Sequence, residues 1–196
     1  MDLILVTDIY GYTSHVAAIV DELSCFFSAT QVVDPYKGRY PDFKSEQEAY
    51  EQFQKLCGID KLTGLVERAV QSGDNSVIAV GFSVGGTALW EVTSMEVSRR
   101  IEMAICFYGS RIREKTYIDP CCETIVVFPR HEDQYDVKAL HDTISGRKNV
   151  TCIKTGYLHG YMNQLSKNFD KEGYRTCMDR LKHCVGTKKV SREHRT

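Results

Sequence analysis

A Gly-x-Ser-x-Gly motif lies near the middle of the chain, in the stretch Gly81-Phe82-Ser83-Val84-Gly85-Gly86. The β-branched apolar run at 76–80 precedes it and a helical pattern at 84–96 follows it. Between a strand and a helix, this motif predicts a tight turn that needs small glycines and holds the serine in a strained, exposed conformation. Ser83 is therefore the predicted nucleophile of an acyl-transfer reaction, at the positive end of the following helix.

A serine hydroxyl needs a general base, and in such a fold that histidine follows the last strand. His159 lies in a glycine-flanked loop after an apolar run at 149–153. His15 and His141 lie in helical patterns, where a surface or capping role is expected, and His131 precedes the place where an acid is needed. His159 is the predicted base.

The third member of such a triad is a carboxylate that fixes the imidazole tautomer, just beyond the apolar run at 124–128. Glu132 and Asp133 are both candidates. Tyr135, three residues after Glu132, fits a turn that places a hydrophobic side chain beneath that carboxylate, whereas aspartate is the commoner residue type. Glu132 is slightly favoured, and Asp136 is expected to cap the next helix.

An oxyanion hole requires two backbone N–H donors. Val84, directly after the nucleophile, supplies one. The other comes from the loop after the first strand, where Ile9 and Tyr10 are the candidates. Asp8 precedes them and either hydrogen-bonds near the nucleophile or simply ends the strand. None of this chemistry needs a metal or an organic cofactor.

The elements that must position these residues alternate along the chain. Short, nearly continuous apolar runs predict strands buried on both faces, at 3–7, 76–80, 103–107, 124–128 and 149–153, with a shorter candidate at 31–33. Helical patterns lie between them, at 14–27, 45–56, 59–72, 84–96, 136–145 and 170–184. This alternation predicts an α/β fold with a doubly wound, mainly parallel sheet flanked by helices.

The 196 residues are enough for one substantial core, which predicts a single domain over 1–185 and a flexible C-terminal tail over 186–196. A formal charge of −1 offers no basic field for nucleic acid or an anionic membrane surface. The N-terminal residues lack signal-peptide features, and the eight cysteines are scattered without a CxxC pair, so reduced thiols and a cytoplasmic location are expected. A monomer or a homodimer is the expected assembly.

Four segments together resemble the dienelactone hydrolase family of α/β-hydrolases, over nearly the whole chain to about residue 184. They are Asp8-Ile9-Tyr10-Gly11, the motif around Ser83, Tyr108-Gly109 and His159-Gly160-Tyr161. The resemblance implies that Ile9 supplies an oxyanion N–H and that Asp8 is an acidic residue near the nucleophile. Founding members have cysteine where this chain has Ser83, so the resemblance is to a serine-nucleophile variant.

The implied function is serine hydrolysis of a small-molecule carboxylic ester, thioester or lactone. Residues 108–123 are too few to hold a lid domain, which predicts a minimal fold and small acyl groups. A nucleotide-binding alternative is disfavoured because the chain has neither a Walker lysine nor a dinucleotide fingerprint. The remaining alternative is a catalytically silent α/β-hydrolase-fold binding or interaction module.

Overall fold

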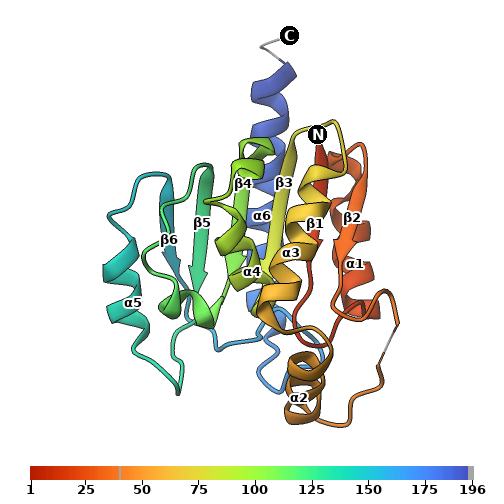
Figure 1. Cartoon of the computed structure of the whole chain (residues 1–196), viewed down its shortest axis with the longest axis vertical. Helices are drawn as coiled ribbons and strands as arrows, with labels where there is room; N and C mark the ends of the chain where they lie inside the picture. Colours follow the sequence, from red (N-terminus) through yellow and green to blue (C-terminus); the bar gives the residue numbers. More distant parts are fainter. Residues whose placement is uncertain (40, 194–196) are drawn as a thin grey trace.

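One six-stranded sheet organises the protein, and all of its strands are parallel (Figure 1). The computed structural model describes residues 1–39 and 41–193, with side chains to residue 188. The strand order is β2-β1-β3-β4-β5-β6. The bounds are β1 Asp2–Val6, β2 Thr30–Val33, β3 Val77–Phe82, β4 Ile101–Phe107, β5 Glu123–Phe128 and β6 Val150–Lys154. The predicted doubly wound α/β fold is confirmed, with a wholly rather than mainly parallel sheet.

The α-helices lie close to the predicted positions. They are α1 Ser14–Leu23, α2 Glu46–Leu56, α3 Gly58–Gln71, α4 Val84–Val92, α5 Val137–Ile144 and α6 Lys171–Glu193. Short 3-10 helices are η1 Ser24–Phe26, η2 Glu96–Arg100 and η3 Ser110–Glu114. Asp136 caps α5 as predicted, because its carboxylate accepts from the Lys138 and Ala139 amides.

Helix α6 continues well past its predicted end at residue 184. The tail predicted from residue 186 is therefore helical as far as Glu193, and residues 194–196 lie outside the described part of the chain. The apolar face of the helix carries on through Leu181 and Val185, both buried, and Lys188 Nζ lies 2.5 Å from a Glu123 carboxylate oxygen. These contacts extend the helix over a stretch in which the sequence shows mostly polar residues.

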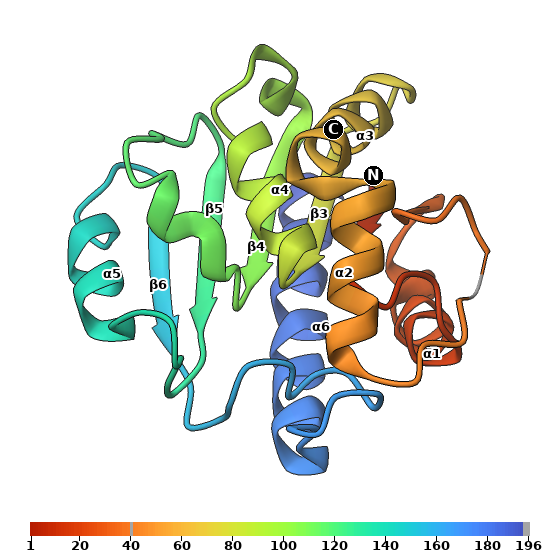
Figure 2. The ribbon, with the colours of Figure 1, turned by 60° about the horizontal axis from the view of Figure 1, so that its bottom comes forward.

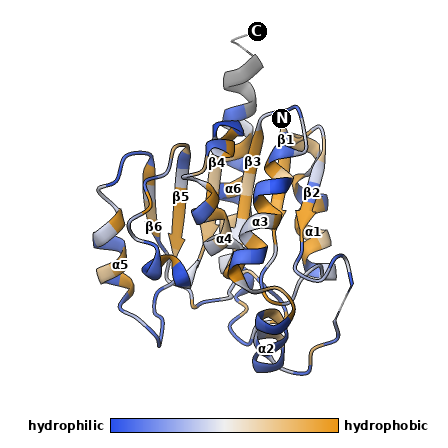
Figure 3. Ribbon diagram, in the orientation of Figure 1, coloured by the Kyte–Doolittle hydropathy of each residue, from blue (hydrophilic) through white to orange (hydrophobic). Residues whose placement is uncertain are grey.

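Alternating strand side chains build a core on each face of the sheet. In β1, Ile4 and Val6 face the core cluster that also contains side chains of α3, α4 and α5, while Leu3 and Leu5 face the opposite cluster, which contains side chains of α1 and α6. This is the period-two pattern of a strand with both faces covered. Figure 3 shows the resulting distribution, with hydrophobic strands in the middle and hydrophilic segments on the outer helices and loops.

Because all strands are parallel, the segments that follow them meet at one edge of the sheet. The carboxyl ends point downward in Figure 1, toward α2 and the segment that joins β6 to α6. Figure 2 turns this edge toward the viewer. None of the helices within residues 1–39 and 41–193 combines the length and apolar character that crossing a membrane requires.

Candidate active site

Ser83 is the single residue between the end of β3 and the start of α4. Its backbone dihedrals are φ 53° and ψ −114°, a strained conformation for a residue with a side chain. Its N–H donates to the carbonyl of Phe107 on the neighbouring strand, at 2.9 Å. The turn is thus anchored to the sheet, and the half-buried serine lies at the N-terminus of α4.

The glycines of the motif let the turn pack tightly. A Cβ at Gly81 would lie 2.5 Å from the Gly85 carbonyl oxygen. A Cβ at Gly85 would collide with the carbonyls of Val6, the last residue of β1, and of Thr7, which follows it. Backbone atoms cannot swing aside as a side-chain end can. The glycines therefore allow α4 to approach β1, as expected for a strand-turn-helix of this kind.

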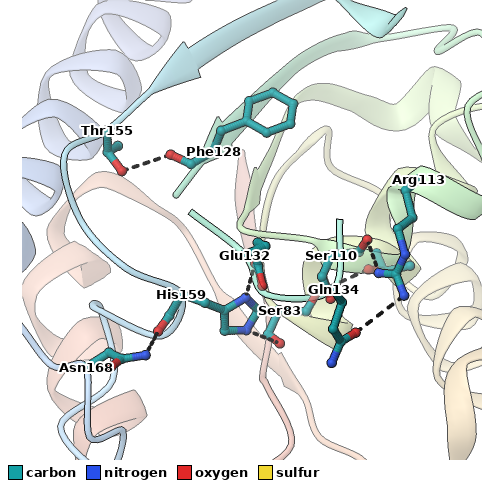
Figure 4. A network of polar contacts seen from close by, with 10 residues as sticks. Ser83, Ser110, Arg113, Phe128, Glu132, Gln134, Thr155, His159 and Asn168 are labelled. Atoms are coloured by element: carbon teal, nitrogen blue, oxygen red, sulfur yellow. Dashed lines mark hydrogen bonds and ion pairs between the residues drawn. The ribbon is translucent and has the colours of Figure 1, made fainter. Parts of the chain in front are cut away.

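Three side chains form a hydrogen-bonded chain from Ser83 (Figure 4). Ser83 Oγ lies 2.9 Å from His159 Nε2, and His159 Nδ1 lies 2.6 Å from Glu132 Oε1. The His159 side chain is 24% exposed and that of Glu132 only 10%. When Nδ1–H donates to Glu132, Nε2 is left to accept the serine proton, which is the arrangement that activates a serine hydroxyl.

The loop that carries His159 is braced by backbone and amide contacts. Asn168 Nδ2 donates to the His159 carbonyl at 2.9 Å, and the Arg130 N–H donates to the Tyr157 carbonyl at 2.6 Å. The Tyr108 ring lies 4.9 Å from the imidazole, centroid to centroid. The bond from Arg130 joins the His159 loop to the segment after β5, which contains Glu132.

The alternatives at the acid position separate clearly. The Asp133 side chain is 98% exposed, and its Oδ1 lies 3.2 Å from His131 Nε2. Tyr135 is half-buried, with the Arg113 guanidinium 5.2 Å from its ring centre. The structure thus brings Glu132 to His159 and leaves Asp133 in solvent.

Arg113 links this acid-bearing loop to η3. Its Nη1 donates to the Ser110 carbonyl at 2.6 Å, and its Nη2 contacts Gln134 Oε1 at 3.4 Å (Figure 4). Together with the position of the guanidinium over the Tyr135 ring, these contacts connect η3 to Gln134 and Tyr135, which follow Glu132 in the chain. Nothing in the sequence pattern singled out Arg113, because it lies in a short connection that shows no motif.

The two predicted loop donors of the oxyanion hole differ in the structure. The Tyr10 N–H donates to Asp8 Oδ1 at 2.9 Å and is occupied, whereas the Ile9 N–H has no hydrogen-bond partner among the described residues. Tyr36 Oη donates to the Ile9 carbonyl at 2.6 Å and steadies that residue. Val84 is the first residue of α4, so its N–H has no acceptor within the helix. Ile9 and Val84 remain the available pair.

Asp8 is buried at the start of the same loop. Burial raises the pKa of its carboxyl group, while hydrogen bonds from the Asn163 side chain and the Tyr10 amide act in the opposite direction. Burial likewise raises the pKa of Tyr10 to about 12. Within the described part of the chain, no group of three or more histidine, cysteine or acidic side chains could hold a metal ion.

Sequence reasoning missed two further residues at the site. Asn163 reaches Asp8 from the segment after His159, and Tyr36 holds Ile9 from the loop after β2. Tyr36 lies in the stretch 34–43, which has three aromatic residues and no strand or helix periodicity, and such a stretch is a weak signal for a loop at the strand ends. No sequence pattern points to Asn163, because its partner Asp8 is distant in the sequence and follows a different strand.

No protein-family model matches the chain. It is 27% identical over 175 residues to the uncharacterized protein YczH of Bacillus subtilis (strain 168), covering 86% of this chain and 84% of YczH. Among solved structures it is similar to a protein of Klebsiella pneumoniae subsp. pneumoniae MGH 78578 that has been assigned as a dienelactone hydrolase. That match has a TM-score of 0.73 at 12% identity and covers 94% of this chain and 86% of the other.

Two further solved structures share the architecture. Est1E of Butyrivibrio proteoclasticus with bound ferulic acid has a TM-score of 0.64 at 14% identity, over 97% of this chain and 89% of that one. The enol-lactonase of Burkholderia xenovorans LB400 has a TM-score of 0.59 at 11% identity, over 92% and 90%. The protein therefore has the α/β-hydrolase fold, and its structural neighbours include proteins named as a dienelactone hydrolase and an enol-lactonase.

Proposed function

We propose that the protein is a serine hydrolase that cleaves carboxylic esters, thioesters or lactones through an acyl-enzyme. The observation that carries the proposal is the pair of hydrogen-bond contacts that links the three side chains: Ser83 Oγ to His159 Nε2 at 2.9 Å, and His159 Nδ1 to Glu132 Oε1 at 2.6 Å. A strained serine at a helix N-terminus, a histidine within hydrogen-bond reach and a nearly buried carboxylate behind it have the geometry of nucleophilic catalysis.

In the proposed reaction, Ser83 Oγ attacks the substrate carbonyl carbon while His159 Nε2 takes the hydroxyl proton. Glu132 stabilises the imidazolium, and the Ile9 and Val84 N–H groups bind the oxyanion. Collapse of the tetrahedral intermediate breaks the bond to the alcohol or thiol, which leaves with the proton from His159. Water, deprotonated by His159, then attacks the acyl-enzyme and releases the carboxylic acid and free Ser83.

Esters and lactones are the proposed substrate class because the structural neighbours include an enol-lactonase and Est1E, which binds ferulic acid. The connection between β4 and β5 is short and contains only the 3-10 helix η3. It adds no lid to the carboxyl edge of the sheet, which favours small acyl groups.

A fluorophosphonate probe tests the proposal directly, since it phosphonylates only an activated serine. The folded protein should be labelled once, at Ser83, as located by peptide mass spectrometry, and Ser83→Ala should not be labelled. If folded wild type resists the probe and hydrolyses no ester or lactone in a panel, the binding-module alternative replaces the hydrolase.

A further inference from the structure

A buried hydrogen bond joins the loop after β1 to the loop that carries His159. Asn163 Nδ2 donates to Asp8 Oδ2 at 2.5 Å. Both residues are buried, with Asp8 8% and Asn163 3% exposed. In a solvent-excluded position such a bond is costly to leave unmade, because each group would then be desolvated without a partner.

At its β1 end, the bridge is tied to the backbone of the oxyanion loop. Asp8 Oδ1 accepts from the Tyr10 N–H at 2.9 Å, and the Asp8 carbonyl accepts from the Gly11 N–H at 3.2 Å. Ile9 lies between these anchored residues. A shift of the Asp8 side chain therefore moves the peptide that carries the Ile9 N–H.

At its other end, the bridge is tied to the backbone that follows His159. Asn163 Oδ1 accepts from the Leu165 N–H at 2.8 Å, and the Asn163 N–H donates to the Gly160 carbonyl at 2.9 Å. Gly160 is the residue next to His159. The amide of Asn163 thus uses both its donor and its acceptor ends to connect two loops that no strand pairing connects.

The same contacts limit what Asp8 can do. Both of its carboxylate oxygens already accept hydrogen bonds, and Ser83 Oγ bonds to His159 instead. Asp8 is therefore placed to hold the loop and not to take the proton of Ser83.

We infer that Asn163 is a positioning residue, which acts through Asp8 to set the place of the Ile9 N–H relative to His159. The inference rests on the proposed function. The oxyanion donor and the general base must both be in position around the same substrate carbonyl group. A displacement of either group by about 1 Å can lower the rate about hundredfold. Because the oxyanion develops only in the transition state, the loss should appear in kcat and not in KM.

Hydrogen exchange tests the bridge independently of any activity. In Asn163→Leu, the Tyr10 and Gly11 amides should exchange at least about tenfold faster than in wild type, as measured on peptides that span residues 8–12. Asn168→Ala is the matched control, because Asn168 holds the His159 carbonyl but has no contact with Asp8. It should leave the exchange of residues 8–12 unchanged. Unchanged exchange in Asn163→Leu overturns the inference, whatever the activity of the protein.

A swapped pair tests the same bond without leaving a buried group unpaired. Asn163→Asp alone sets two buried carboxylates face to face and should speed exchange at residues 8–12. Asp8→Asn combined with Asn163→Asp restores every contact, since the amide at position 8 accepts from Tyr10 and donates to position 163, which accepts from Leu165. The double variant should regain wild-type exchange, and a double variant no better than the single one overturns the inference.

The activity readout separates the two proposals. If wild type hydrolyses p-nitrophenyl acetate, Asn163→Asp should lower kcat about hundredfold with KM within about twofold, and the swap should recover kcat. A higher KM with unchanged kcat contradicts the positioning role. If wild type has no activity, the proposed hydrolysis fails, while the exchange experiment still decides whether the bridge holds the loop.

Discussion

Glu132 and His159 meet through a 2.6 Å contact between Oε1 and Nδ1, although they follow different strands, β5 and β6. Adjacent parallel strands end at the same edge, so their following loops are neighbours. The Arg130 amide, bonded to the Tyr157 carbonyl, fixes the two loops against each other.

Glu132→Gln should lower kcat/KM for p-nitrophenyl acetate about hundredfold or more, because the amide cannot stabilise the imidazolium. Asp133→Asn, one residue away and in solvent, should stay within about twofold of wild type. Steady-state kinetics on both folded variants make the comparison. Equal losses in the two variants would contradict the assignment of Glu132.

Ser83→Ala should reduce hydrolysis of p-nitrophenyl acetate and butyrate by about a thousandfold or more, since it removes the proposed nucleophile. Ser94→Ala, at an exposed hydroxyl beyond α4, is the matched control and should keep full activity. A Ser83→Ala protein that turns over substrate at the wild-type rate would show that the nucleophile lies elsewhere.

Ser83→Gly should be more stable than Ser83→Ala by about 1 kcal/mol, because glycine adopts φ 53° without the strain that any side chain adds. Both variants lack the hydroxyl, so their difference isolates the backbone. Urea denaturation followed by circular dichroism measures it. If alanine proves as stable as glycine, the turn is not strained.

His15 should make the protein sensitive to mild acid. A surface or capping role was expected for it, but its side chain is buried, 5% exposed, against the rings of Phe169 and Tyr174. Burial lowers its pKa below the ordinary value of about 6.5. The contribution of neutral His15 is therefore fully present above about pH 6.5 and is lost as the pH falls toward its lower folded-state pKa.

His15→Phe removes the titrating group and keeps an aromatic ring in this contact. The free energy of unfolding of wild type should fall more between pH 7.5 and pH 5 than that of His15→Phe. His131→Phe, at an exposed position, should retain the wild-type dependence. If the wild-type and His15→Phe curves are parallel, His15 does not control acid stability.

The sequence by itself determined the main helices and strands and the order of the candidate site residues along the chain. Strands buried on both faces show as apolar runs, and the turn at Ser83 shows because only glycine tolerates the backbone contacts at positions 81 and 85. These are local requirements, so they are written in neighbouring residues. The position of His159 after the last strand follows from the same alternation.

The tertiary structure alone decided which side chains meet. Glu132 and Asp133 are adjacent in sequence, and only the folded loop shows that Glu132 contacts His159 while Asp133 lies in solvent. The residues alone left both Ile9 and Tyr10 as candidates, and in the structure the Asp8 carboxylate occupies the Tyr10 amide. Asn163 and Asp8 come from opposite ends of the chain, and their bond exists because parallel strands bring distant loops to one edge. Such contacts between distant residues leave no periodicity or motif in a single sequence.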